Sequence, residues 1–275
     1  MSRSRLPVTR AGKAIPGAVA IVAAVCGVGF FAVPLVALVV RAPWSSTWDI
    51  VREPSVRAAL RLSLECSVAA TGVSIVLGTP LAWFLARATY PGRSLVRTVT
   101  TLSMVLPPVV SGVALLLAFG RRGLVGHWLY DAFGVQLPFS IGGVVIAESF
   151  VSMPFLVLTL EAAFRSTDER LEEAAFTLGA SRWTTFRRIT LPAIAPSLVA
   201  GSVLAWARAL GEFGATITFA GNFPGTTQTM PLLVYQALDT NFDAAILLSL
   251  LLVAVSFVTL FALRGRWVAA LWSRA

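Results

Sequence analysis

Two charged residues of opposite sign, Arg208 and Glu212, lie four positions apart within one strongly apolar stretch of the chain. This spacing would place both side chains on one face of a helix. Because burying charge in hydrocarbon is costly, such residues usually face a pathway or a partner. Two interpretations stay open: an ion pair that neutralises itself and packs the helices, or a gate in which Glu212 neutralises Arg208 until an anion arrives. We favour a structural or gating role over direct binding.

Weaker polar groups follow in the Gly-rich stretch Gly211–Gly221. Its hydroxyls and backbone N–H groups, and helix N-termini, are weak contacts of the kind that a dianion favours. A proline pair in another apolar stretch removes backbone hydrogen bonds and forces a break, and broken membrane helices line cavities or are packed by neighbours. The candidate pathway or gate residues are therefore Pro107, Pro108, Ser111, Arg208, Glu212, Thr216 and Thr218.

Membrane-spanning helices are the elements that must position these residues. The 275-residue chain is 57% hydrophobic and only 13% charged, whereas soluble domains carry about 25% charged residues. A bilayer core needs about 20 helical residues. Six stretches qualify: Ile15–Val40, Leu62–Ala86, Thr98–Phe119, Ile141–Leu160, Ile194–Thr216 and Ala244–Leu263. We therefore predict an all-α integral membrane protein with six transmembrane helices, of which only the third is broken.

The distribution of basic residues indicates how these helices are oriented. Of the 22 Lys and Arg residues, fifteen fall in segments that are inside if the N-terminus is cytoplasmic, and five fall outside. Cytoplasmic loops carry the excess of Lys and Arg in membrane proteins. We therefore expect a multi-pass protein of the cell membrane (inner or plasma membrane) with both termini cytoplasmic. The basic excess indicates topology, and no nucleic-acid partner is expected.

The longest connection between predicted spans, Glu161–Ala193, is cytoplasmic on this count, and its first half has the pattern of a short helix. Ser166 with Glu169 three residues later forms a capping box, which marks a helix start. Gly179 lies where a helix C-terminus favours a left-handed residue. Apolar residues recur between them on one helix face: Leu171, Ala174, Ala175 and Leu178.

The second half of this connection predicts another short helix, Ser181–Thr190, which Pro192 stops. On physical grounds alone, the two helices could equally be an amphipathic pair that lies on the membrane surface. The spacing of particular residues favours a different role for them.

That spacing is Glu-Ala-Ala, three residues, Gly, nine residues, Ile-x-Leu-Pro, and it resembles the signature of type-1 ABC importer permeases. All seven defined positions match: Glu173, Ala174, Ala175, Gly179, Ile189, Leu191 and Pro192. In that family the segment forms a coupling helix that sits in a groove on a separate ATP-binding subunit. The resemblance therefore implies that small Ala residues allow close approach of the ATPase and that Gly179 allows a sharp turn.

A narrower resemblance is to molybdate permease subunits. It rests on four segments: Leu106–Val110, Gly120–Gly123, Leu210–Phe219 and Gly225–Thr229. Sulfate and thiosulfate permeases are close relatives with a distinct version of the third segment, and we rank them second. The family transports tetrahedral dianions, so the resemblance implies molybdate, together with tungstate, as the substrate.

The sequence contains no G-x-x-x-x-G-K-[S/T] phosphate-binding loop, since its only Lys, Lys13, is followed by Ala14. ATP would therefore be used by an ATPase on another polypeptide, and no cofactor is expected in this chain. The resemblance implies a homodimer of this chain, an ABC ATPase subunit and an external molybdate-binding protein, working by alternating access in a lipid bilayer. The domains predicted are an N-terminal tail, first helix and outer loop (1–58), the ABC transmembrane domain (59–262) and a cytoplasmic tail (263–275).

A stand-alone secondary transporter and an intramembrane enzyme are the competing classes of protein. Secondary transporters more often show inverted repeats or broken helices in matched positions, and the sequence indicates one broken helix with no matched partner. An intramembrane enzyme needs a nucleophile–base or metal set. The chain has a single His, His127, and none of the corresponding motifs. We therefore predict a transport subunit and not an enzyme.

Overall fold

The structure is a computed structural model that describes residues 17–272. The chain divides into two compact units, residues 1–42 and residues 43–275. In the first unit the described element is α1 (Gly17–Val40), an apolar helix of 24 residues. The second unit contains the other elements and all the candidate site residues.

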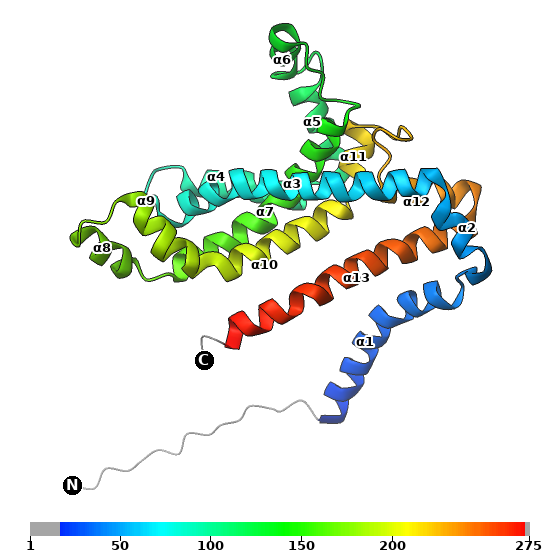
Figure 1. The fold of residues 1–275 in the computed structure, drawn as a ribbon, viewed down its shortest axis with the longest axis horizontal. Coiled ribbons are helices and arrows are strands. Elements are labelled where there is room, and N and C mark those ends of the chain that lie inside the picture. Colours follow the sequence, from blue (N-terminus) through cyan, green and yellow to red (C-terminus); the bar gives the residue numbers. More distant parts are fainter. Residues whose placement is uncertain (1–16, 273–275) are drawn as a thin grey trace. The chain divides into compact units, whose positions relative to one another are not determined.

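Helices joined by turns and loops make up the described part of the second unit (Figure 1). In chain order its elements are η1 (Trp44–Ser46), α2 (Thr47–Arg52), α3 (Pro54–Arg87), α4 (Arg93–Val105), α5 (Pro108–Phe119), α6 (Gly126–Phe133), α7 (Ile141–Ser166), α8 (Glu169–Thr177), α9 (Arg182–Thr185), the π-helical turn η2 (Phe186–Thr190), α10 (Leu191–Leu210), α11 (Gly214–Phe219), α12 (Met230–Thr240) and α13 (Phe242–Trp272).

Within residues 17–272, five helical stretches are long and apolar enough to cross a membrane. They are Val19–Val40, Pro54–Arg87, Ile141–Ser166, Arg182–Leu210 and Phe242–Thr259. The prediction of an all-α, multi-pass membrane protein is confirmed. The count of six is not confirmed, because the third predicted stretch, Thr98–Phe119, is divided between α4 and α5.

The break between α4 and α5 lies at the proline pair, as the sequence predicts. Leu106 and Pro107 both have extended backbone, with ψ of 134°. Each of them precedes a proline, whose ring disfavours the helical conformation of the residue before it. Pro108 then begins α5, where a missing N–H breaks no helical hydrogen bond. Helix α5 consequently runs in a different direction from α4 (Figure 1).

A second break divides the predicted span Ile194–Thr216. Helix α10 ends at Leu210, and α11 begins at Gly214. The prediction of one broken helix without a matched partner was therefore wrong. The predicted span includes the residues of this break, so the mean hydropathy of the stretch does not reveal it.

The half-helices that follow the two breaks, α5 and α11, pack directly against each other (Figure 1). Glycines make this approach possible. A Cβ atom added at Gly112 would lie 2.5 Å from the Cβ of Thr218, and one added at Gly214 would lie 2.6 Å from the Cβ of Pro108. Non-bonded carbon atoms normally stay about 3.5–4.0 Å apart. Any larger side chain at either glycine would therefore push the two half-helices apart.

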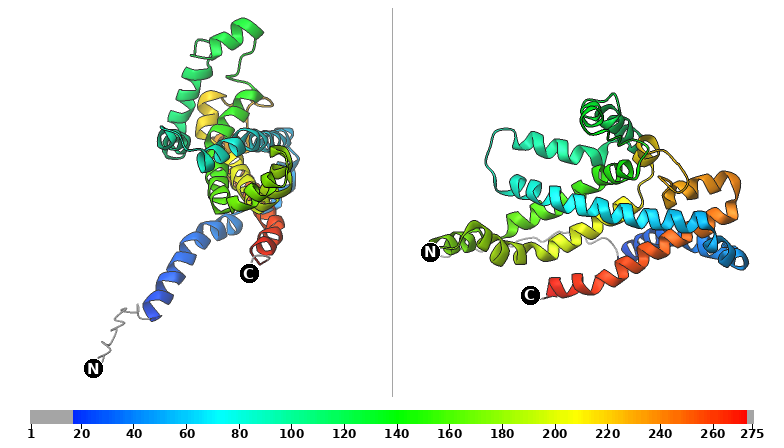
Figure 2. Two further views of the ribbon diagram at one scale, coloured as in Figure 1. Left: turned by 90° about the vertical axis from the view of Figure 1, so that its left-hand side faces the viewer. Right: turned by 45° about the horizontal axis from the view of Figure 1, so that its top comes forward.

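Helices α3, α7 and α10 pack side by side (Figure 2), and a core cluster of buried residues lies among them. Small residues bring these helices close, since a Cβ added at Gly201 of α10 would lie 3.0 Å from Leu156 of α7. Such packing is how transmembrane helices associate, because lipid supplies no hydrophobic force between them. The fully buried side chains include Leu85, Leu156, Leu160, Phe164 and Ile194.

The connection predicted as Glu161–Ala193 is shorter than expected. Helix α7 continues to Ser166, and the chain is helical again from Arg182 to Leu210. Pro192 does not stop a helix, because it lies in the first turn of α10 directly after η2. A proline is tolerated in a first turn, and the wider hydrogen-bond spacing of a π-helical turn accommodates the missing N–H.

Helix ends from distant parts of the sequence meet at one end of the bundle (Figure 1). The C-terminal ends of α3 and α7 and the N-terminal ends of α4 and α10 lie there, next to α8 and α9. We call this region the α8 end of the bundle.

Candidate functional site

Helix α8 begins later than the sequence predicts. Its N-cap is Asp168, whose carboxylate accepts a 3.0 Å hydrogen bond from the N–H of Arg170. Ser166 is instead the last residue of α7, and its hydroxyl donates to the carbonyl of Ala163. The capping-box prediction was wrong because α7 continues through Ser166. The Ser-x-x-Glu pattern does not reveal whether a preceding helix has already ended.

The C-terminus of α8 has the predicted left-handed glycine. Gly179 has a φ of +82°. The N–H of Ala180 donates to the carbonyl of Ala175, and the N–H of Gly179 donates to that of Phe176, both at 3.0 Å. These two reversed hydrogen bonds form a Schellman motif. Because other residues are strained at this φ, the sharp turn depends on Gly179.

Helix α8 lies at the surface of the described chain. None of its residues is buried, and Leu171 is 55% exposed. The apolar face that the sequence predicts is therefore uncovered by the described chain. Glu173 and Ala174 are exposed and Ala175 is partly exposed. Exposed apolar residues gathered on one element with a polar rim are typical of a surface that binds another chain.

The second part of the spaced pattern lies at the start of α10. Ile189 and Leu191 are partly buried and Pro192 is exposed. The buried Thr190 donates its hydroxyl hydrogen bond to Glu172 of α8 at 2.8 Å. The fold thus brings the two parts of the pattern together at the α8 end of the bundle.

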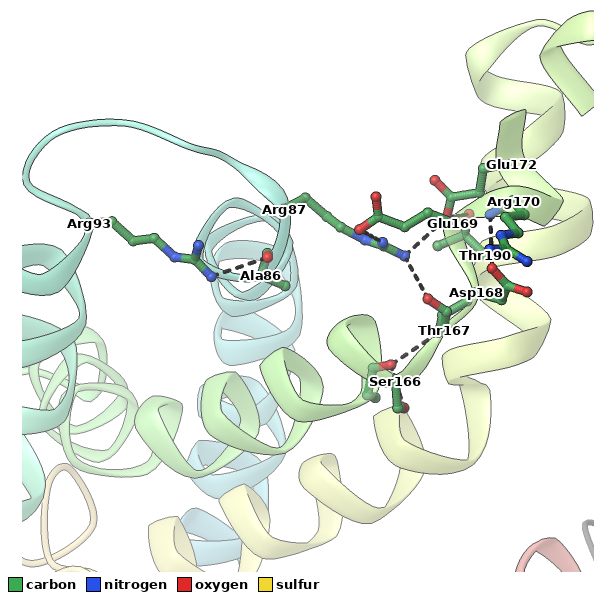
Figure 3. Close-up of polar contacts among 11 residues, drawn as sticks. Ala86, Arg87, Arg93, Ser166, Thr167, Asp168, Glu169, Arg170, Glu172 and Thr190 are labelled. Atoms are coloured by element: carbon green, nitrogen blue, oxygen red, sulfur yellow. Dashed lines mark hydrogen bonds and ion pairs between the residues drawn. The ribbon is translucent and has the colours of Figure 1, made fainter. Parts of the chain in front are cut away.

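An ion-pair cluster that the sequence analysis did not identify joins α8 to α3 (Figure 3). Arg87, the last residue of α3, forms ion pairs with Glu169 and Glu172, the second at 3.7 Å. It also donates to the carbonyl of Thr167 at 3.4 Å. The Arg87 side chain is only 10% exposed. A basic residue at the end of a predicted span, opposite acidic residues in another loop, is the signal that could have indicated this contact.

The predicted pair of intramembrane charges is formed. The Nη1 atom of Arg208 lies 2.6 Å from Oε2 of Glu212, and the Glu212 side chain is 1% exposed. The two residues do not share one helix, because α10 ends at Leu210. The other carboxylate oxygen of Glu212 accepts a 2.9 Å hydrogen bond from the N–H of Ala215 in α11. The pair therefore joins the end of α10 to the start of α11, where a carboxylate is favoured by the helix dipole.

The other candidate pathway residues surround this bend. Ser111 of α5 and Thr216 of α11 are buried. Thr218 is partly buried, and its hydroxyl donates to the carbonyl of Gly214 at 2.8 Å. The two prolines at the start of α5 are exposed. Because α5 packs on α11, the structure brings residues from two distant segments to one place.

Three buried side-chain oxygens on α7 and α11 have no hydrogen-bond partner among the described residues. They are Oε2 of Glu148, Oγ of Ser152 and Oγ1 of Thr216. Buried polar atoms in proteins are nearly always hydrogen-bonded, so these oxygens can bond to water or to a molecule that enters the bundle.

The chain belongs to the family described as Binding-protein-dependent transport system inner membrane component, which residues 78–274 match. It is therefore the permease subunit of an ABC importer, a transport subunit embedded in the membrane. Its fold is that of a bacterial ABC transporter involved in the import of the acidic polysaccharide alginate, with a TM-score of 0.71 and 20% identity over 90% of this chain and 93% of that chain.

Two relatives indicate which ABC importer permeases this chain resembles most. The chain is 46% identical to the Molybdenum transport system permease protein ModB of Mycobacterium tuberculosis over 243 residues, which cover 88% of this chain and 92% of that protein. It is 35% identical to the Sulfate transport system permease protein CysT of Escherichia coli over 84% of each chain. The resemblance to molybdate permeases that the sequence motifs indicate is confirmed, and the sulfate permeases are more distant.

Proposed function

We propose that this chain is the membrane-spanning subunit of an ATP-driven importer of molybdate, and of tungstate with it. The observation that carries this proposal is the 46% identity to a molybdenum permease over nearly the whole chain, against 35% to a sulfate permease. The buried hydroxyls of Ser111 and Thr216 near the bend are weak polar contacts of the kind that a passing dianion needs.

The ATPase partner docks on α8 in this proposal. Two features support it: α8 buries no residue, and its end is turned sharply at Gly179. The residues that contact or shape the docking surface are those of the spaced pattern: Glu173, Ala174, Ala175, Gly179, Ile189, Leu191 and Pro192.

The α8 end of the bundle faces the cytoplasm, and both termini are cytoplasmic. Arginines from three segments support this orientation, because they gather where helix ends meet, and cytoplasmic ends carry the basic excess. They include Arg87, Arg93, Arg97, Arg165, Arg170, Arg182, Arg187 and Arg188. The opposite end then receives molybdate from an external binding protein.

The working unit is a homodimer of this chain with two ATPase subunits. ATP binding closes the ATPase pair and draws the two α8 helices together, and the bundle changes from inward-open to outward-open. The proline pair at the start of α5 serves as a hinge or pathway wall in this scheme. The Arg208–Glu212 pair holds the bend between α10 and α11 and acts as a gate or as a structural brace.

The test is ATPase activity in liposomes that contain this chain, its cognate ATPase and its binding protein. Molybdate, tungstate and sulfate are titrated separately. Stimulation by low concentrations of molybdate and tungstate, with sulfate inert, is the expected result. Stimulation by sulfate alone would assign the chain to the second candidate, a sulfate permease, which its 35% identity to CysT supports. Absence of any copurifying ATPase would contradict the proposal as a whole.

A further inference from the structure

Helix α8 lacks the apolar anchoring that normally fixes a helix in place. It is nine residues long and buries none of them, and both Leu171 and the C-cap residue Leu178 are exposed. Helices this short are marginal in water and take most of their stability from packing. The position of α8 must therefore depend on its polar contacts.

Those contacts converge on one arginine of a membrane-spanning helix (Figure 3). Arg87 ends α3 and pairs with Glu169 in the first turn of α8 and with Glu172 one turn later. Glu172 in turn accepts the hydroxyl hydrogen bond of Thr190 in η2. The guanidinium thus connects α3, α8 and, through Glu172, the segment that leads into α10.

The surroundings of Arg87 distinguish these pairs from ordinary surface ion pairs. Its side chain is 10% exposed and that of Glu172 is 20% exposed, whereas Glu169 is 67% exposed. Exposed pairs contribute little because water and salt screen them. A shielded arginine that loses its acceptors keeps its desolvation cost without compensation. The shielded Arg87–Glu172 ion pair and the hydrogen bond from Arg87 to the carbonyl of Thr167 therefore contribute more to holding α8 in place than the exposed Arg87–Glu169 pair does.

Helix α3 is suited to carry a displacement from α8 across the bundle. It runs without interruption for 34 residues and packs along α7 and α10. Near its other end, Ser63 accepts a 2.7 Å hydrogen bond from the N–H of Met230, the first residue of α12. One continuous helix therefore joins the α8 end to the connection that follows α11.

We infer that Arg87 is a positioning residue of the transport cycle: it clamps α8 to α3, so that movement imposed on α8 by the ATPase is transmitted directly to a membrane-spanning helix. This inference rests on the proposed function, because it takes the ATPase as the source of the movement of α8. The clamp itself is a property of this chain and can be tested without substrate or ATP.

The first test is limited trypsin digestion of the purified chain, with cleavage after the exposed Arg170 of α8 followed by mass spectrometry. In Arg87→Ala, we expect cleavage to be about tenfold faster, because local opening is governed by the few contacts that hold a segment. Arg93→Ala is the matched control. It removes an arginine whose contact is the carbonyl of Ala86, within 3.2 Å, and which forms no contact with α8 in the described structure. Equal cleavage rates for wild type and Arg87→Ala would overturn the clamp.

The second test is molybdate uptake per ATP hydrolysed in liposomes with the ATPase and binding protein. In Arg87→Ala, we expect this ratio to fall about tenfold, within the range of typical coupling energies, while the ATPase still copurifies. Arg87→Lys should recover part of the ratio because it keeps the charge, and Arg93→Ala should match wild type. A ratio unchanged in Arg87→Ala would overturn the inference.

A third variant guards against poor folding of Arg87→Ala. Glu169→Gln combined with Glu172→Gln removes both acidic partners from the surface of α8 and leaves α3 intact, and it should reproduce both effects.

The proposed substrate and the proposed role of Arg87 would fail in different ways. If wild type shows no molybdate response, the proposed substrate is wrong, and the trypsin result still decides whether Arg87 holds α8.

Discussion

Removing the carboxylate of Glu212 should destabilise the bend between α10 and α11 more than any exposed ion pair on this chain. The carboxylate makes two charge-assisted contacts, with Arg208 at 2.6 Å and with the N–H of Ala215 at 2.9 Å. Its side chain is 1% exposed, and that of Arg208 is 29% exposed. Glu212→Ala would therefore leave a partly buried guanidinium and a helix N-terminus without their acceptor.

The size of the effect follows from these contacts. A hydrogen bond to a charged group contributes about 1.5–3 kcal/mol, and breaking a buried pair costs about 3–5 kcal/mol. We expect Glu212→Ala to lower the free energy of unfolding by about 3–5 kcal/mol on this basis. Glu212→Gln should cost about 1.5–3 kcal/mol, because the amide oxygen still accepts from Ala215 while the ion pair is lost.

The assay is a double-mutant cycle on Arg208 and Glu212, read from thermal unfolding in detergent. The chain offers a matched control in Arg61 and Glu65 of α3, which have the same four-residue spacing and a 2.7 Å contact but are 80% and 57% exposed. We expect a coupling energy of about 2 kcal/mol for Arg208 and Glu212, and a clearly smaller one for the control. Equal coupling energies for the two pairs would refute the reasoning, because burial would then not determine the strength of the contact.

Further predictions concern α8 and the packing of α5 on α11. Ala174→Trp should uncouple ATP hydrolysis from uptake without changing thermal stability, because Ala174 is exposed and the larger Trp side chain would contact only the ATPase subunit. Normal uptake by this variant would argue against docking of the ATPase on α8. Gly179→Trp should uncouple as well, but it also strains a φ of +82°, by roughly 1 kcal/mol, so Gly179→Asn, which tolerates this φ, separates strain from bulk. Gly112→Ala should cost about 1–3 kcal/mol of stability by overpacking against Thr218, while Gly72→Ala, where an added Cβ meets nothing within 4 Å, should not; similar unfolding temperatures for both would contradict the α5–α11 packing.

Local patterns in the sequence were sufficient wherever the physical cause acts within a few residues. The length of the apolar stretches identified a multi-pass membrane protein, because a helix must cross a fixed thickness of hydrocarbon. The proline pair identified the break before α5, because two consecutive prolines disfavour helical backbone in both Leu106 and Pro107. The left-handed turn at Gly179 was predictable for the same kind of reason, since glycine adopts that φ with the least strain.

Tertiary structure decided the features that depend on which segments meet. Glu172 and Glu173 are neighbours in sequence, yet the fold pairs Glu172 with Arg87 and leaves Glu173 exposed. Arg87 and Thr167 are 80 positions apart, and no local pattern joins them. The break after Leu210 was hidden because an ion pair and a close glycine contact with α5 hold it, and neither contact is visible in the hydropathy of the predicted span. Sequence reports the conformational preferences of short segments, whereas charge pairing and close packing depend on how the helices lie against one another.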